Sequence, residues 1–175
     1  QRQMCIRDRN KNLIKFNLRE NRGSKDSIKM GIGIHIGELV IGTIGRETRM
    51  ETTVISDTVN ASARLENLNK VYKTNLLISG EVYDELSDRL RLDCRLIDRT
   101  QVKGKKESLE VFEVFATDQK ELYDVKFQSK EKLEIVVRMF LTGKIEDAIF
   151  TFTEIQNYET VDPVIAFWSS RLRSQ

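Results

Sequence analysis

The sequence predicts an α+β fold in which helices pack on an antiparallel sheet, followed by a small all-α extension. Isoleucines at positions 28, 32, 34 and 36 alternate with other residues, which is typical of a strand with one buried face. Residues 58–72 instead carry apolar side chains at helical spacing, as do residues 130–175. The order of elements up to Ala116 is expected to be βββ-α-β-α-β-β, with short connections that favour helices layered on one sheet.

The chain divides into four parts by composition. Residues 1–9 show neither helical nor strand periodicity, and position 1 is not methionine, so they are predicted to be foreign or disordered. Residues 10–116 are expected to form the sheet domain, residues 117–129 a polar linker, and residues 130–175 a helical tail.

The sheet domain is predicted to begin with the end of a helix, Leu13–Glu20, followed by a polar break. The strand Ile28–Gly37 comes next, and Gly37 opens a turn into a second short strand, Leu39–Ile41. A third strand leads into position 56. The glycines between positions 31 and 45 lack the spacing of a P-loop or a dinucleotide fingerprint, so we expect them to allow close packing of strands and tight turns.

The central helix is predicted over Thr58–Tyr72, with Ser56-Asp57 supplying its N-cap. One stripe of this helix can face the sheet, and it consists of Ala61, Leu65, Leu68 and Tyr72. The elements that follow are the strand Leu76–Ile78, the short helix Glu81–Leu86, and the strands Arg91–Asp98 and Leu109–Phe115 on either side of the loop Val102–Lys105.

The tail shows helical spacing throughout. One apolar stripe consists of Leu133, Val136, Val137, Phe140 and Leu141, and Gly143 is expected to end that helix. A second stripe runs from Ile145 to Ile155, and Asp162-Pro163 opens a third helix. The spacing of Gly143, Ala148 and Phe152 resembles the second half of a tetratricopeptide repeat. Because a single repeat cannot bury its own apolar face, the tail is expected to contact the sheet domain or another protein.

Charge and cysteine content exclude several classes of protein. Lysine and arginine total 29 and the acidic residues 27, a net charge of +2 that gives no reason to expect nucleic acid or an anionic membrane as partner. Cys5 and Cys94 lack the spacing of a disulfide framework or a zinc site, which favours a reducing, cytoplasmic location. No apolar run approaches the roughly 20 residues that span a bilayer, although a longer parent protein could be anchored through regions outside this chain.

Three blocks of sequence carry a family resemblance. The central block, Met50–Glu66, contains a strand, a turn, the tripeptide Thr-Val-Asn and an arginine four residues after that asparagine. Two glycine-containing stretches precede it, Gly31–Glu38 and Gly42–Gly45, and the loop Val102–Lys105 with the strand Leu109–Val114 follows. In this order and spacing the chain resembles the C-terminal portion of the class III nucleotidyl cyclase catalytic domain of bacterial type.

The resemblance covers residues 28–116 and implies both a fold and an activity. The fold would be the ferredoxin-like sandwich of these cyclases, with its N-terminal strands outside this chain. The activity would be that of an adenylate cyclase, which converts ATP to cyclic AMP and pyrophosphate in intracellular signalling. A guanylate cyclase, and a non-catalytic cyclase-like module that binds nucleotide or regulates a partner, are the alternatives.

Asn60 and Arg64 are the candidate catalytic residues. At i and i+4 they share one face of the helix, turned away from its core stripe. An amide and a guanidinium there can donate hydrogen bonds to a phosphoryl group on which negative charge develops. The resemblance assigns them the stabilisation of the transition state as the ribose 3′-hydroxyl attacks the α-phosphorus. The structural alternative is a surface asparagine and a solvated arginine.

Thr53 and Lys103 are the candidate substrate-binding residues, again through the resemblance. Thr53 occupies the position that reads the purine edge, and its hydroxyl can accept from the adenine amino group, which favours ATP over GTP. Lys103 would pair with the terminal phosphates. The alternatives are a β-branched residue that suits a strand and a basic loop that is simply solvated.

The resemblance also implies metals and a second protomer. The complete domain would hold two Mg²⁺ or Mn²⁺ ions on two aspartates that have no counterpart in Gln1–Ser27, so no metal site is predicted in this chain and the chain alone is expected to be inactive. Family sites form between two protomers of a homodimer. Asp57 is interpreted as a helix cap rather than a metal ligand, and Ser56 stands where the family usually has glycine. His35 is interpreted as structural because no catalytic partner is signalled.

Overall fold

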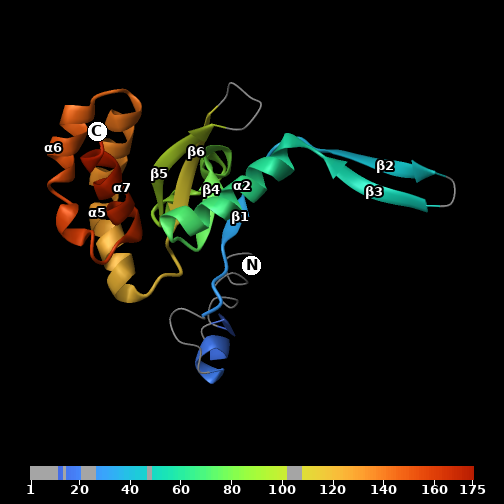
Figure 1. Ribbon diagram of the computed structural model, residues 1–175, viewed down its shortest axis with the longest axis horizontal. Helices are drawn as coiled ribbons and strands as arrows, with labels where there is room; N and C mark the ends of the chain where they lie inside the picture. Colours follow the sequence, from blue (N-terminus) through green and yellow to red (C-terminus); the bar gives the residue numbers. More distant parts are fainter. Residues whose placement is uncertain (1–11, 14, 21–26, 47–48, 102–107) are drawn as a thin grey trace.

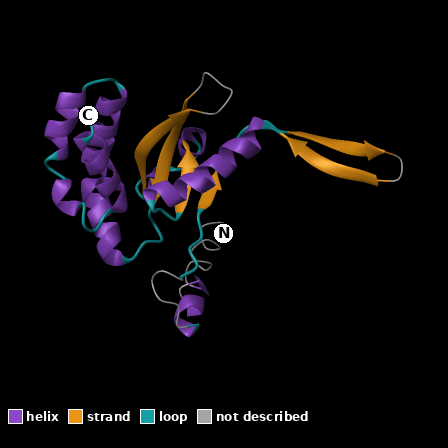
Figure 2. Cartoon of the chain, viewed as in Figure 1, coloured by secondary structure: helices purple, strands orange, loops and turns teal. Residues whose placement is uncertain are grey.

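The computed structural model describes residues 12–13, 15–20, 27–46, 49–101 and 108–175, with the backbone alone for 43–46 and 49–55. It contains a mixed four-stranded sheet of order β1-β4-β6-β5 and a separate two-stranded hairpin, with helices beside the sheet (Figures 1 and 2). The sheet strands are β1 (Ile32–Ile34), β4 (Leu76–Ser79), β5 (Cys94–Gln101) and β6 (Ser108–Val114). The predicted α+β class is therefore confirmed.

The expectation of an antiparallel sheet is wrong at one pair, because β1 runs parallel to β4 while the other pairs are antiparallel. The chain travels from β1 through a hairpin and helix α2 before it returns in β4, and a crossover that contains a helix brings two strands into parallel register. The hairpin consists of β2 (Val40–Arg46) and β3 (Arg49–Ile55), and Figure 1 shows it extending away from the sheet beyond one end of α2.

Helix α2 (Asp57–Tyr72) packs across β1 and β4 with the stripe expected from its sequence. Ala61, Leu65 and Tyr72 are buried, and Leu68 is half-buried against the same core. The contact with β1 is very close at Gly33, where an added Cβ would lie 2.4 Å from both the Glu66 nitrogen and the Ser62 carbonyl oxygen. The glycines between positions 31 and 45 were expected to allow close packing of strands, but the close neighbour at Gly33 is the backbone of a helix.

Two short helices connect β4 to β5. Helix α3 (Gly80–Asp84) follows β4 directly, and α4 (Asp88–Arg91) occupies residues that include the expected start of the next strand. The strand expected from residue 91 therefore begins at Cys94. Arg91 is held in the helical turn because its guanidinium donates to the carbonyls of Tyr83 at 3.2 Å and of Asp84 at 2.5 Å.

The C-terminal extension contains α5 (Lys120–Leu141), α6 (Ile145–Phe152), the 3₁₀ turn Gln156–Tyr158 and α7 (Pro163–Arg173). The polar linker expected over residues 117–129 is wrong, since α5 already begins at Lys120. This segment is polar in sequence but partly buried in the fold, since Lys126 is buried and paired with Glu113 and Asp118. Gly143 ends α5 in the left-handed region at φ 81°, and Asp162 caps α7, both as expected.

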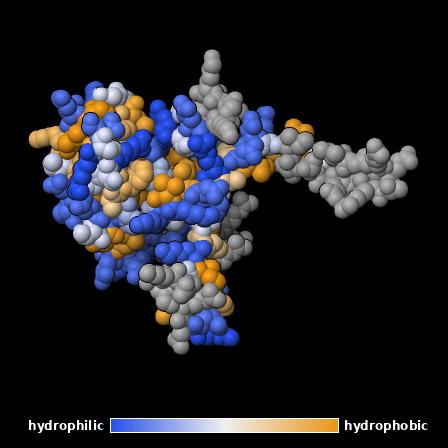
Figure 3. Space-filling view, viewed as in Figure 1, coloured by the Kyte–Doolittle hydropathy of each residue, from blue (hydrophilic) through white to orange (hydrophobic). Residues whose placement is uncertain are grey.

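The extension shares one hydrophobic core with the sheet. Trp168 of α7 is fully buried, and its Nε1 donates to the Ile97 carbonyl of β5 at 2.8 Å. Strand β5 lies at the edge of the sheet, and Glu134 of α5 accepts a hydrogen bond from the Leu96 nitrogen at 3.0 Å. The helices thus cover an edge that would otherwise expose unpaired backbone groups. Figure 3 shows hydrophilic and hydrophobic residues interspersed on the visible face of this half of the molecule.

None of the helices in the described ranges is both long enough and apolar enough to cross a bilayer.

Candidate active site

The two predicted catalytic residues lie one helical turn apart on α2, near its N-terminus. Asn60 is exposed and Arg64 is half-exposed, while the neighbouring Ala61 and Leu65 face the core. Neither polar side chain forms a hydrogen bond or ion pair with another described residue. The donors of both side chains therefore remain available to a ligand, which agrees with the position expected from helical geometry.

The N-terminus of α2 is tied to the loop after β1 by two hydroxyl groups. Ser56 Oγ and Thr58 Oγ1 both donate to the Glu38 carbonyl, at 2.6 and 2.7 Å. Ser56 Oγ also accepts from the Thr58 nitrogen at 3.0 Å, so Ser56 is the N-cap. The interpretation of Asp57 as the cap is therefore wrong, because Asp57 is already the first residue of the helix.

The departure from glycine at position 56 has a simple structural explanation. Ser56 has φ −165° and ψ 143°, an extended conformation open to any residue. Glycine is not required by the backbone there, and the serine hydroxyl adds the capping bond. The turn before α2 therefore accommodates serine without strain.

Replacing Ser56 by alanine is expected to lower the free energy of unfolding by about 0.5–2 kcal/mol, the usual cost of losing an N-cap. Ser56→Gly should lower the free energy of unfolding by only about 0.3 kcal/mol, because glycine is also accepted at the N-cap. The Glu38 carbonyl keeps Thr58 as a donor in both variants. Urea unfolding of the two variants measures the difference, and equal midpoints for alanine and wild type would contradict the capping role.

Thr53 lies in β3, opposite Gly42 of β2 and three residues before the cap. The expected position in a strand is confirmed. Because only two residues separate Thr53 from the N-cap Ser56, Thr53 lies close to the start of α2. The role of its side chain in reading a purine stays a prediction.

Lys103 lies outside the described residues, but the strand ends that flank it are described. Because α2 ends just before β4 begins, the N-terminal half of α2 lies toward the far end of β4. Strand β6 runs antiparallel to β4, so its first residue, Ser108, and its partner in β5, Gln101, lie toward that same end of β4. The topology therefore places the flanks of the Lys103 loop and the start of α2 at the same end of the sheet's strands.

His35 follows β1 at this end of the strands and contacts other residues of the fold. Its Nδ1 lies 2.9 Å from Ser79 Oγ and 3.6 Å from the Glu81 carboxylate. Ser79 is fully buried and caps α3 by accepting from the Val82 nitrogen at 3.4 Å. The ring thus joins the end of β1 to the start of α3, in keeping with the structural interpretation of this histidine.

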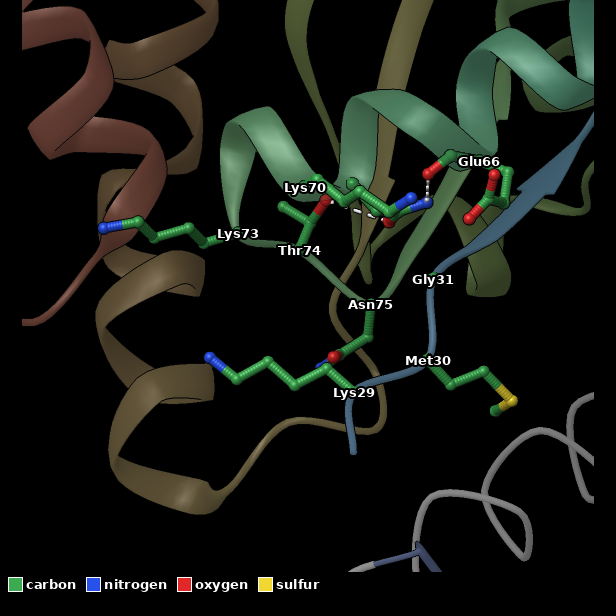
Figure 4. A pocket seen from close by; sticks show the side chains of 9 residues that line it. Lys29, Met30, Gly31, Glu66, Lys70, Lys73, Thr74 and Asn75 are labelled. Carbon is green, nitrogen blue, oxygen red and sulfur yellow. Dashed lines mark hydrogen bonds between the residues drawn. The ribbon is translucent and has the colours of Figure 1, made fainter. Parts of the chain in front are cut away.

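A hollow of about 380 Å³ lies at the opposite, C-terminal end of α2 (Figure 4). Lys29, Lys70 and Lys73 line it, but its best-buried polar group, Asn69, is already satisfied. The Asn69 amide donates to the Ile32 carbonyl at 3.0 Å and accepts from Thr74 at 3.0 Å. This hollow is a structural junction, separate from the end of α2 that carries Asn60.

No group of three or more histidine, cysteine or carboxylate side chains suited to a metal ion occurs among the residues that the structure describes.

A buried network of charges is the feature that sequence reasoning missed. Arg95 is fully buried and lies between Glu113, at 2.7 Å, and Asp162, at 2.6 Å. Lys126 joins the same Glu113 at 2.6 Å and also pairs with Asp118. Burial alone would raise the pKa of Asp162, but the hydrogen bonds and charge of Arg95 outweigh it and lower that pKa. For Asp118 burial dominates and raises the pKa despite Lys126.

Comparison with known proteins identifies the family. The model of the Adenylate and Guanylate cyclase catalytic domain matches residues 5–115. Over 90 residues the chain is 46% identical to an adenylate cyclase from Anabaena cylindrica, a segment that covers 51% of this chain and 18% of that protein. Over 99 residues it is 33% identical to adenylate cyclase 1 from Rhizobium meliloti, covering 57% of this chain and 15% of that one. The chain thus spans less than a fifth of the length of these relatives.

Two solved structures are similar over about half of the chain. A bacterial light-regulated adenylyl cyclase superposes with a TM-score of 0.43 at 27% identity, covering 57% of this chain and 28% of that one. The guanylyl cyclase Cya2 superposes with a TM-score of 0.40 at 33% identity, covering 50% and 43%. Because the family model spans more than half of its residues, the chain belongs to the adenylate and guanylate cyclase catalytic domain family.

Proposed function

We propose that this chain is the C-terminal portion of an adenylate cyclase catalytic domain and supplies the phosphate-handling half of its active site. The observation that supports this best is the pair Asn60 and Arg64. Both lie on the open face of a helix whose N-terminus is fastened to the sheet domain, and neither is paired with a described residue. The strand ends that flank Lys103 lie toward the same edge of the sheet.

In this proposal the ribose 3′-oxygen of ATP attacks the α-phosphorus, and the bond to pyrophosphate breaks. The Asn60 amide and the Arg64 guanidinium donate hydrogen bonds to the α-phosphoryl oxygens, which gain negative charge in the transition state. Lys103 pairs with the departing phosphates, and Thr53 accepts from the adenine amino group. The backbone that carries Asn60 and Arg64 is fixed by helix α2 and by the bonds of Ser56 and Thr58 to the Glu38 carbonyl.

The other half of the site is proposed to come from a second cyclase protomer. The family typically uses two metal ions, and these would polarise the attacking and leaving oxygens when bound. In the family two aspartates hold these ions, and the resemblance gives them no counterpart in Gln1–Ser27. A protomer that carries the metal aspartates would complete the site in a dimer.

A cytoplasmic location of this chain stays a prediction.

A mixing experiment tests the proposal. The partner is the catalytic domain of the Anabaena cylindrica adenylate cyclase, with the residues that align with Asn60 and Arg64 replaced by alanine. Each protein alone should form little cyclic AMP, and the equimolar mixture should form it from ATP in preference to GTP. A heterodimer that is seen by sedimentation but makes no cyclic nucleotide would contradict the enzymatic role and favour a non-catalytic module. Preference for GTP would identify a guanylate cyclase instead.

Asn60→Ala and Arg64→Ala should each lower kcat of the mixture by about 10²–10³-fold, the range for removing one donor to a developing oxyanion. Asn67→Ala on the exposed side of the same helix and Arg89→Ala on α4 are matched controls. Initial rates of cyclic AMP formation measure the effect. Equal losses of kcat in the two pairs of variants would contradict a specific catalytic role of Asn60 and Arg64.

A further inference from the structure

Helix α7 is joined to the edge strand β5 by polar contacts at three places along its length. At its start the Asp162 carboxylate holds the Arg95 guanidinium at 2.6 and 2.9 Å. The two further contacts are the Trp168 Nε1 bond to the Ile97 carbonyl at 2.8 Å and the Arg171 Nη1 bond to Asp98 at 2.8 Å. Positions 162, 168 and 171 thus meet positions 95, 97 and 98 in order, which fixes one register between helix and strand.

Asp98 is the point where three elements meet. It is only 5% exposed and lies at the β-bulge of β5, where the pairing with β6 shifts between Leu96 and Asp98. Its carboxylate accepts from Tyr72 at the end of α2, at 2.6 Å, and from Arg171 of α7, at 2.8 Å. Burial and the neighbouring Asp98 carboxylate raise the pKa of the Tyr72 hydroxyl, so that the hydroxyl keeps its proton and remains a donor.

Aromatic packing holds the Arg171 side chain over this junction. Its guanidinium lies 4.6 Å from the centre of the Phe140 ring and 4.8 Å from that of Trp168. Phe167 of α7 meets the Tyr72 ring edge-on at 4.8 Å, which adds an apolar contact between α7 and α2. A planar guanidinium stacks readily on aromatic rings, so these contacts restrict the Arg171 side chain while it donates to Asp98.

The elements joined at Asp98 are the ones that carry the candidate site. Helix α2 holds Asn60 and Arg64, and β5 leads through Gln101 into the segment that contains Lys103. A bulge re-aims the strand that follows it, so the bond that fixes the bulge also influences the direction of β5 as it leaves the sheet. Loss of the Arg171 bond would leave a buried carboxylate with fewer donors and a looser bulge.

We infer that the helical extension is a positioning unit for the active site, with Arg171 and Asp98 as positioning residues that hold α2 and the β5–β6 hairpin in one arrangement. The inference rests on the proposed function for its catalytic consequence. The restriction of α2 and β5 by α7 does not depend on the proposed function. The extension is then a device through which displacement of α7 would lower turnover.

The test compares Arg171→Met with Arg171→Lys and with Phe152→Leu, a core change in α6 that leaves the α7–β5 bonds in place. Hydrogen exchange is read in the peptides over 57–72 and 94–101, and kcat and KM for ATP are read in the mixed cyclase. Arg171→Met should speed exchange in both peptides and lower kcat by about tenfold, within the range by which residues that connect two elements alter the coupling between them. KM should change little, and Arg171→Lys should recover part of both effects.

Three outcomes decide the matter. Equal effects of Arg171→Met and Phe152→Leu, in exchange and in kcat, would overturn the inference, because general destabilisation would then explain both. Unchanged kcat in Arg171→Met in an active wild-type mixture would also overturn it. If the wild-type mixture is inactive the proposed function fails, and selective faster exchange in Arg171→Met would still support α7 as the element that positions α2 and β5.

Discussion

Replacing Arg95 by leucine is expected to destabilise the protein by about 3–5 kcal/mol, a large part of the stability of a domain of this size. The guanidinium is fully buried, and the two carboxylates that it neutralises, Glu113 and Asp162, are at most 2% exposed. Leucine would leave Asp162 without a cation and Glu113 with Lys126 alone. An uncompensated buried charge is expensive, because neither water nor a second cation can replace the lost partner.

The pH dependence of this variant adds a second readout. Arg95 lowers the pKa of Asp162 against the effect of burial, so the stability that their pairing contributes is present above the ordinary aspartate pKa. That contribution is lost as the pH falls through the lowered pKa of the folded protein. Arg95→Leu should therefore lose stability mainly at neutral pH and differ less from wild type in acid.

Arg99→Leu on the same strand is the matched control. Its ion pair with Glu110 spans 3.1 Å, but the arginine side chain is 42% exposed. An exposed pair is expected to contribute less than about 1 kcal/mol. Urea unfolding at neutral pH compares the two variants. Similar losses at positions 95 and 99 would show that the buried network contributes no more to stability than an exposed ion pair.

Gly33→Ala is expected to cost about 1–3 kcal/mol or more, because the new methyl group would meet backbone rather than a flexible side chain. The added Cβ would lie 2.4 Å from the Glu66 nitrogen and 2.8 Å from the Leu65 Cβ, both on α2. A helix backbone cannot yield locally, so relief requires α2 to move away from β1. Any such shift would also displace Asn60 and Arg64 from the sheet edge.

Gly42→Ala provides the control for Gly33→Ala. An added Cβ at Gly42 meets no atom of the described part of the chain within 4 Å, and the same chemical change there should be neutral or slightly stabilising through the unfolded chain. Unfolding midpoints of the two variants in urea give the comparison. A neutral Gly33→Ala would mean that α2 and β1 are not in the close contact seen between them.

The local elements could be predicted from sequence where periodicity was strong. The stripe of α2, the end of α5 at Gly143 and the start of α7 at Asp162 all follow from residue type and spacing. The candidate residues Asn60 and Arg64 were placed on the open face of α2 by the same helical geometry.

Features that depend on distant residues could not be predicted in this way. Arg95 and Glu113 lie opposite each other on β5 and β6, and charged residues in an edge strand ordinarily indicate a face toward water. Arg95 and Glu113 are buried because α5 and α7 pack against this part of the sheet. Most of residues 117–129, which have the polar composition of a linker, belong to α5. The pairing of Asp98 with Tyr72 and Arg171 joins positions that no local pattern relates.

The most direct test of the central claim is the rate of cyclic AMP formation in the equimolar mixture of this chain with the substituted Anabaena cylindrica domain. We expect product from ATP in the mixture, little from either protein alone, and a loss of about 10²–10³-fold with Arg64→Ala. A mixture that forms heterodimers and stays inactive, or one in which Arg64→Ala is as active as wild type, would contradict that claim.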